Sequence, residues 1–346
     1  MTSSRLNKVR LQLEKNKIQA LLLIHPANIS YITGFKTEDS FLFVNDKRCF
    51  LITDFRYLAE YDKKLKNRNI QLLEIEKDIF QMLKTISAHQ RITQLHFEQD
   101  YTSFAFYQKL KEVFKKISPA KEIIEELRLI KEPKEVLLIK KAVSLIKLTF
   151  KTVIKKLKKD ISEFELANEL EYFIKQHQGF GLAFEPIVAF GENSSFPHAQ
   201  KTKRRLKYNE PVLLDIGAEF EGYKSDLTRT YFFGKMSSHF KVIYEIVKEA
   251  KQRAILAIKP GIAISEIDKV ARNFIKSKGL KQYFKHSLGH GIGLEVHEQP
   301  RINSQNSTLI KPGMVFTIEP AVYLPKQFGI RLEDVIYVSR KGAEIL

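Results

Sequence analysis

The sequence predicts two domains: an α/β domain over residues 1–125, and an α+β domain over residues 126–346 that consists of two similar halves. Three observations lead to this prediction. Short helix and strand patterns alternate up to residue 125. The charged segment Lys131–Glu135, with a proline suited to the first turn of a helix, marks a boundary. Beyond it, an order of two helices, a histidine-containing segment and an acid-bearing strand pair occurs twice.

The first domain is predicted to form a mixed sheet with helices. Strand patterns cover Ile18–Ile24, Ser40–Val44, Cys49–Thr53, Ile70–Ile75 and Gln94–Phe97. Helix patterns cover Leu6–Lys15, Phe55–Leu65, Ile79–Ile86 and Thr102–Phe114. These segments contain no glycine-rich motif for binding phosphate.

Each half of the second domain is predicted to begin with a pair of helices. An apolar stripe with spacings of three and four residues predicts a helix from Pro133, and Ser162 with Glu165 forms a capping box for the next one. The second pair is expected at Ser238–Ile258 and from Ser265 to about Lys278. Two such halves can pack about a pseudo-two-fold axis, with each half contributing two acids to a central site.

Composition excludes several classes of protein. The net charge of +18 comes from lysines spread over nearly every predicted helix, which indicates a solvated surface and no nucleic-acid partner. The basic cluster Lys201–Arg205 is interpreted as a solvated loop. The longest uncharged run, Ala20–Phe35, is too short and too broken for a membrane span. A single cysteine, Cys49, and the lack of an apolar leader lead us to expect a cytoplasmic protein.

A glycine-rich segment, Gly289–Glu298, carries two histidines, His290 and His297. Glycine permits turns and close approach of the main chain to a ligand. Alternation of apolar and polar residues over Leu294–His297 predicts a strand that directs His297 to one face. The segment gains weight from acids elsewhere in the chain.

Four acids lie on apolar, strand-like runs: Asp215 and Asp226 on a predicted hairpin, and Glu319 and Glu333 on a second strand pair. Any one of them alone would more often be exposed or paired with a lysine or arginine. A buried carboxylate needs such a partner or a metal ion. The whole set, with one imidazole, suits two divalent cations bridged by carboxylates, with Mn²⁺, Co²⁺, Zn²⁺ or Fe²⁺ as suitable ions.

These segments also carry a family resemblance. The motifs resemble those of the pita-bread metallopeptidases, and within them the Xaa-Pro peptidases, aminopeptidase P and prolidase; they lie at Asp215–Ala218, Gly222–Thr230, His286–Glu298, Ile318–Pro320 and Gly329–Asp334. The first domain resembles the creatinase-type amino-terminal domain, so the resemblance covers the whole chain. Ala321 and Phe196 depart from the usual residues, which affects only fine pocket shape.

The resemblance implies the pita-bread fold and two divalent ions, with Mn²⁺ favoured and Co²⁺ or Zn²⁺ as alternatives. It assigns Asp215 to one ion, Asp226 and Glu333 to both ions as bridges, and His290 with Glu319 to the second ion. By the same resemblance, the ions would supply a hydroxide for attack on the peptide carbonyl, and Glu319 would transfer a proton.

Four further residues are assigned to the pocket by the same resemblance. His198, His286 and His297 line it and can donate to the substrate carbonyl or its oxyanion. Arg331 lies two residues before Glu333, so we expect it to orient Glu333 or Asp226.

The resulting prediction is a metallo-exopeptidase, an Xaa-Pro aminopeptidase acting on peptides with proline second, and a homodimer. The alternative is an Xaa-Pro dipeptidase (prolidase), which must bind the free carboxylate of proline; Arg301 or a residue of a dimer partner is the candidate cation. Methionine aminopeptidase resembles only the second domain. A metal-free, creatinase-like hydrolase or an inactive binding module is disfavoured by the complete ligand set.

Overall fold

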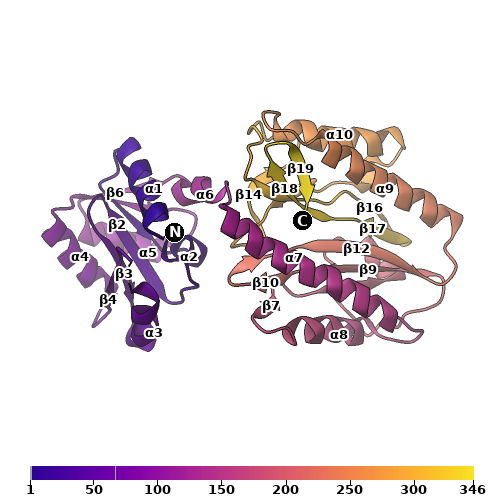
Figure 1. The fold of residues 1–346 in the computed structure, drawn as a ribbon, viewed down its shortest axis with the longest axis horizontal. Coiled ribbons are helices and arrows are strands. Elements are labelled where there is room, and N and C mark those ends of the chain that lie inside the picture. The colour runs from indigo at the N-terminus through magenta and orange to yellow at the C-terminus, as the bar shows by residue number, and fades with distance from the viewer. Residues whose placement is uncertain (1, 67) are drawn as a thin grey trace. The chain divides into compact units, whose positions relative to one another are not determined.

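The computed structural model describes residues 2–66 and 68–346, and its chain divides into two compact units, Met1–Arg128 and Leu129–Leu346 (Figure 1). The domain boundary expected after residue 125 falls inside helix α6 (Ile123–Arg128). This helix packs on α1 (Thr2–Lys15) and α2 (Pro26–Thr33), so it belongs to the first unit. Among the described residues, none of the helices combines the length and apolar character needed to span a bilayer.

The first unit contains a six-stranded sheet in the order β4-β3-β2-β1-β5-β6. Its strands are β1 (Ala20–Leu23), β2 (Ser40–Asn45), β3 (Cys49–Thr53), β4 (Gln71–Glu74), β5 (Gln94–Glu98) and β6 (Lys116–Ala120). The β1–β2 and β2–β3 pairs are antiparallel and the other pairs are parallel, which confirms the predicted mixed sheet. Helices α3 (Phe55–Leu65), α4 (Ile79–Gln90) and α5 (Phe104–Val113) complete the unit.

The first half of the second unit pairs two helices with antiparallel strands. These elements are α7 (Pro133–Val153), α8 (Glu163–Lys175), β7 (Phe180–Leu182), β8 (Ile187–Phe190), β9 (Glu210–Ile216), β10 (Ala218–Phe220), β11 (Tyr223–Lys224) and β12 (Leu227–Phe233), with short 3₁₀ turns η1 (Ile154–Lys156) and η2 (Gly191–Ser195). The predicted capping box is present, because Ser162 and Glu165 each accept from the other's backbone N–H.

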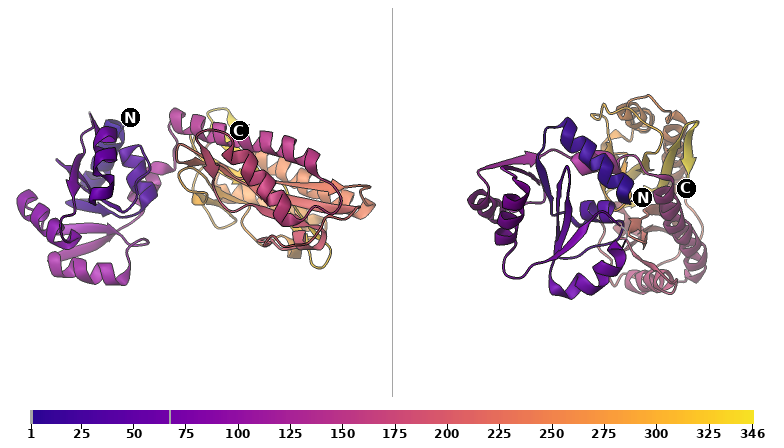
Figure 2. Two further views of the ribbon diagram at one scale, coloured as in Figure 1. Left: turned by 90° about the horizontal axis from the view of Figure 1, so that it is seen from below. Right: turned by 60° about the vertical axis from the view of Figure 1, so that its left-hand side comes forward.

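The second half repeats this plan. Its elements are α9 (Ser238–Ala257), α10 (Ile264–Ser277), β13 (Gly289–Gly291), β14 (Glu298–Ile302), β15 (Val315–Ile318), β16 (Ala321–Leu324), β17 (Phe328–Arg331), β18 (Asp334–Ser339) and β19 (Gly342–Ile345), with the turn η3 (Lys281–Tyr283). Helices of the second unit lie against its strands (Figure 2). One apolar core forms around α7 and α8 and also includes Ile292, Val315 and Val335 of the second half, and another forms around α9 and α10.

The strand registers bring the acids to equivalent places in the two halves. In the first half β9 pairs with β12, so that Asp215 lies opposite Thr228. In the second half β15 pairs with β18, so that Ile318 lies opposite Asp334. Asp226 directly precedes β12, Glu319 directly follows β15 and Glu333 directly precedes β18. The acids therefore sit at the ends of paired strands, where each strand meets a turn.

Candidate metal centre

Three groups of side chains converge closely enough to hold an ion. The ligand atoms within each group lie within 4.8 Å of one another; the groups are Asp215–Asp226–Glu333, His290–Glu319–Glu333 and Asp226–His290–His297. Glu333 belongs to the first two groups, and Asp226 belongs to the first and third. This overlap matches two neighbouring cations that share carboxylates. All five predicted ligands are thus brought together.

Three acids of this centre are buried, and each has one oxygen atom that accepts no hydrogen bond. Asp215, Asp226 and Glu333 are 8%, 6% and 2% exposed. One oxygen of each (Oδ1, Oδ1 and Oε1) is buried without a hydrogen-bond partner. A buried, unpartnered carboxylate oxygen is costly unless a cation compensates it. The donor set therefore fits divalent metal ions.

Burial and crowding of like charges shift the acids toward their protonated forms. Desolvation, followed by the neighbouring Asp215 carboxylate, raises the pKa of Glu333 to about 8. Desolvation and the Glu333 carboxylate raise the pKa values of Asp226 and Glu319 well above their usual range. A bound cation would favour the ionised forms instead, so ion binding and proton release are linked.

His290 presents one nitrogen toward this cluster. Its Nδ1 lies 3.1 Å from the carbonyl oxygen of Gly291, an acceptor, so we assign the proton to Nδ1. Nε2 is then a lone-pair donor, 3.6 Å from both Asp226 Oδ2 and Glu319 Oε1. Desolvation lowers the pKa of His290 to about 4, which keeps the ring neutral as metal ligation requires.

Arg331 contacts Asp215, and not Glu333 or Asp226 as the sequence led us to expect. Its Nη2 donates to Asp215 Oδ2 at 2.5 Å. The expectation relied on strand alternation, but β17 ends at Arg331 and β18 starts only at Asp334, so the alternation is interrupted before Glu333. Arg331 is 4% exposed and also donates to the carbonyl oxygen of Pro197 at 3.0 Å.

Tyr323 is a site residue that sequence reasoning missed. Arg331 Nη1 donates to Tyr323 Oη at 2.5 Å, and this hydroxyl lies 3.5 Å from His286 Nε2. In the β16–β17 hairpin Tyr323 is opposite Gly329 and Ala321 is opposite Arg331, so Tyr323 and Arg331 are diagonal neighbours on one face. A correct register for that hairpin would have identified the tyrosine.

His286 is placed beside this group but is not free to donate. Desolvation lowers its pKa to about 4, so the ring is neutral and carries one N–H. Nδ1 lies 2.7 Å from the carbonyl oxygen of Ser287, which can only accept. The N–H is therefore used there, and Nε2 accepts from Tyr323. We assign His286 to the support of Tyr323.

Thr228 and Arg229 hold Glu333 from the neighbouring strand, and neither was predicted in that role. Thr228 Oγ1 donates to Glu333 Oε2 at 2.8 Å, and Arg331 Nε donates to the same hydroxyl at 3.0 Å. Arg229 donates to the carbonyl oxygen of Glu333 and pairs with Asp334 at 2.6 Å. In the β9–β12 register Thr228 lies opposite Asp215 and so projects to the metal face, whereas Arg229, opposite Leu214, projects to the other face and reaches Glu333 through its carbonyl oxygen.

The segment Leu294–His297 is not a strand, so that prediction was wrong. It forms a bent loop, and β14 begins only at Glu298. Gly293 N donates to the carbonyl oxygen of Glu295 at 3.1 Å, which folds the loop on itself. His297 still reaches the centre, because its ring centroid lies 4.3 Å from that of His290.

His198 lies in an exposed loop after η2. Desolvation is the main cause that lowers the pKa values of His286 and His297, and proximity to His198 lowers both further. The loop is fixed at Pro197 by the bond from Arg331. His198 and His297 are exposed, while His286 is partly buried.

Comparison with known proteins matches both units of the chain. Residues 138–340 match the model of metallopeptidase family M24, and residues 5–130 match the creatinase/prolidase N-terminal domain. The chain belongs to metallopeptidase family M24. This membership confirms the recognised family, the two-part pita-bread architecture and the metallo-exopeptidase class.

Individual relatives place the chain within the Xaa-Pro peptidases of family M24. An Xaa-Pro dipeptidase of Pyrococcus horikoshii is 34% identical over 96% of this chain and 94% of the relative. The structure of an Xaa-Pro dipeptidase from Bacillus anthracis matches with a TM-score of 0.96 and 33% identity, over 100% of this chain and 97% of that one. An X-Pro aminopeptidase from Thermotoga maritima gives a TM-score of 0.91 and 30% identity, over 99% and 96%.

Proposed function

We propose that this member of family M24 is an Xaa-Pro dipeptidase (prolidase) that works with two divalent ions. Mn²⁺ is the ion that we favour. The dipeptidases among its relatives support the alternative reading of the sequence better than the aminopeptidase favoured first. The three buried oxygen atoms without partners support the ions. The position of Arg301 supports the preference for dipeptides.

Arg301 is the arginine available for a substrate carboxylate. It lies directly opposite His290 in the β13–β14 pair, and opposite residues of an antiparallel pair project to the same face. Arg229 and Arg331 are engaged by Asp334 and Asp215. For Arg301, no carboxylate of residues 2–66 or 68–346 lies within ion-pair distance. An exposed guanidinium beside the centre can form a bidentate bond with the carboxylate of a C-terminal proline.

The side chains of the centre divide the work of hydrolysis. When bound, divalent ions acidify a coordinated water and polarise the scissile carbonyl. Glu319 accepts the proton of the attacking water and delivers it to the proline nitrogen, which leaves as a secondary amine. His297 and His198 donate to the carbonyl oxygen as negative charge develops on it. Arg331 holds Asp215, and Thr228 holds Glu333, so both acids keep their orientation.

Steady-state kinetics on a matched pair of substrates tests this function. An Xaa-Pro dipeptide and the same sequence extended by one residue are compared with Mn²⁺-loaded protein. We expect kcat/KM to favour the dipeptide by roughly 100-fold, since the longer substrate loses a charge-assisted bond. Arg301→Ala should remove that preference by raising KM for the dipeptide alone. Equal or better turnover of the longer peptide would instead identify an Xaa-Pro aminopeptidase.

A further inference from the structure

A buried ion pair lies beside the loop that carries His297. Lys131 Nζ and Glu298 Oε1 are 2.6 Å apart, and the two side chains are 1% and 7% exposed. A buried pair of this kind contributes little net stability, because desolvation of two charges offsets their attraction. Glu298 directly follows His297 in the chain. We therefore ask whether the pair fixes the position of the loop that carries His297.

The Glu298 carboxylate lies inside the bend of that loop. A Cβ on Gly293 would be 2.6 Å from Glu298 Oε1, so only glycine leaves room for the carboxylate there. The backbone N–H of Glu295 points to Glu298 Oε2 at 3.4 Å. The carbonyl oxygen of Gly293 accepts from the N–H of Lys224 at 2.8 Å. The loop is thus folded around the acid that Lys131 holds.

Lys131 approaches from a firmly anchored segment. Its backbone N–H donates to the carbonyl oxygen of Gly313 at 2.8 Å. At the start of α7, Glu135 closes the capping box with Glu132, and it accepts from Tyr223 Oη at 2.9 Å. Tyr223 belongs to β11, the short strand that precedes Asp226. The Lys131–Glu135 segment therefore contacts both loops that lead to the centre.

We propose that Lys131 is a positioning residue that acts through Glu298 to hold the His297 ring at the metal centre. This inference rests on the proposed role of His297 at the substrate carbonyl. Neutralising Lys131 removes the cation that faces the buried Glu298 carboxylate, and the loop moves to hydrate that charge. The consequence is a misplaced His297 with the ligands Asp215, Asp226, His290, Glu319 and Glu333 undisturbed.

A double-mutant cycle tests this coupling. Lys131→Met, His297→Ala and the double variant are compared for kcat, KM and metal content, on whichever Xaa-Pro substrate is turned over best. We expect Lys131→Met to lower kcat by about 10- to 100-fold with metal content and KM unchanged. In the His297→Ala background the same change should lower kcat no further, because the residue it acts through is already gone. Multiplicative losses would overturn the proposal.

Two further variants guard against a purely structural effect. Arg204→Met breaks the partly buried pair with Glu210 (2.5 Å) in the same unit, and its effect on kcat should be the same with and without His297. Glu298→Gln keeps the shape of the side chain and a hydrogen bond from Lys131, so it serves if Lys131→Met does not fold; it should show the same dependence on His297. If His297→Ala alone leaves kcat unchanged, the role of His297 under the proposed function fails, and this inference fails with it. A normal His297→Ala loss with independent effects rejects the inference alone.

Discussion

Both units contain a buried glutamate at the end of a strand, and the two glutamates differ in what surrounds them. In the first unit, Glu98 Oε2 accepts from the backbone N–H groups of Ile24 and His25 at 2.6 and 2.7 Å, and Oε1 accepts from Asn28 Nδ2 at 2.6 Å. In the second unit, Glu333 Oε2 accepts from Thr228, while Oε1 is buried without a partner. Desolvation is the largest cause of a raised pKa for both.

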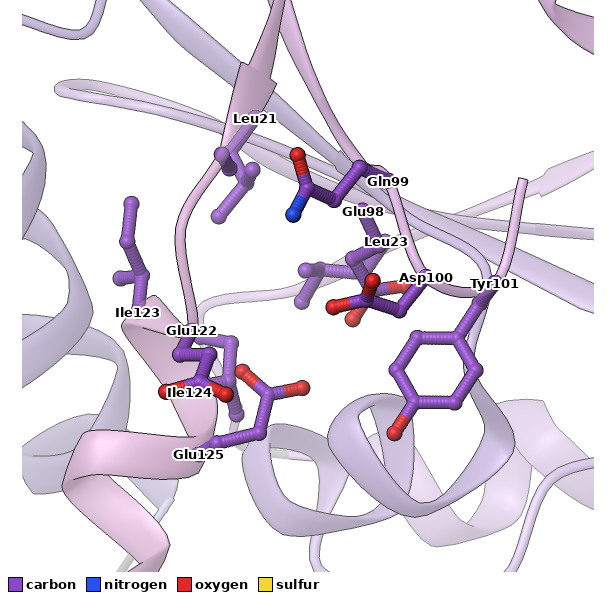
Figure 3. A pocket seen from close by; sticks show the side chains of 11 residues that line it. Leu21, Leu23, Glu98, Gln99, Asp100, Tyr101, Glu122, Ile123, Ile124 and Glu125 are labelled. Atoms are coloured by element: carbon purple, nitrogen blue, oxygen red, sulfur yellow. The ribbon is translucent and has the colours of Figure 1, made fainter.

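This difference distinguishes a glutamate with a structural role from a glutamate of a candidate metal site. Figure 3 shows Glu98 with Asp100, Glu122 and Glu125 around one pocket, whose volume is about 10 Å³. That space holds about one water molecule, and the Glu98 oxygens already have donors. At the centre in the second unit, Asp215, Asp226 and Glu333 each have one buried oxygen atom that accepts no hydrogen bond. Burial and a raised pKa occur in both places, so the unpartnered oxygens are the feature that indicates a cation.

The largest effect is expected from Asp226→Asn, which removes a carboxylate that we propose bridges the two ions and keeps the shape of the side chain. Turnover should fall by about 10³-fold or more, because charge stabilisation of the transition state is lost. Metal analysis of Mn²⁺-loaded protein should give two ions per chain in the wild type and one or none in the variant. Unchanged stoichiometry in Asp226→Asn would refute the bridging role.

His297→Ala and His198→Ala address the two exposed histidines that we propose contact the substrate carbonyl. Each should lower kcat by on the order of 10²-fold, the typical loss of one donor to a developing oxyanion. Both variants should retain the metal content of the wild type, since neither histidine is proposed as a ligand. His297 is the sharper case because it lies in one of the three converging groups. Loss of an ion from His297→Ala would move this histidine into the ligand set.

Local patterns in the sequence predicted much of the fold. The helix Phe55–Leu65 was predicted with its observed bounds, and the capping box at Ser162 located the start of α8. The helix Pro26–Thr33 was not predicted, because it lies within the uncharged run that had been considered only as a membrane span. The strand predicted at Leu294–His297 was wrong since Gly293 and the Glu298 carboxylate bend a segment whose alternation alone favours a strand.

The side chains that orient the acids depend on register, which a sequence does not display. Tyr323 reaches Arg331 only through the pairing of β16 with β17. Arg331 reaches Asp215 across 116 positions of the chain. The acids themselves were found because a carboxylate at the end of an apolar run is unusual in any register. The candidate acids thus follow from the local sequence pattern and their ligand roles from the family resemblance, whereas the side chains that support them follow from topology.

The pH dependence of the stability of the metal-free protein tests whether the charges of the carboxylate cluster are uncompensated when no cation is bound. The raised pKa of Glu333, about 8, gives stability that is present below its unfolded value and lost as pH rises toward 8. The pKa values of His286 and His290 are lowered to about 4, so these two residues reduce the stability of the folded protein only as pH falls below about 6.5. Between pH 6.5 and 8, Tm of the metal-free wild type should therefore fall.

Glu333→Gln isolates that contribution. In metal-free protein it should reduce the fall in Tm by on the order of 5 °C, and added Mn²⁺ should stabilise the wild type more at pH 8 than at pH 6.5. Scanning calorimetry with and without chelator measures both. Identical pH slopes for the wild type and Glu333→Gln would mean that the acid is already compensated without metal.

The smallest effect on turnover is expected from Glu98→Gln, the matched change in the first unit. The amide oxygen of Gln can still accept from Ile24 and His25, but its NH₂ group would face Asn28 Nδ2. Asn28 cannot turn over to accept, because its Oδ1 accepts from Arg128 at 2.6 Å and its Nδ2 also donates to Glu125 at 2.6 Å. Two facing donors cost about 1–3 kcal/mol of unfolding free energy, with kcat and metal content unchanged. Urea unfolding beside steady-state kinetics measures both, and a fall in metal content would show that the acids of the two units are not different in kind.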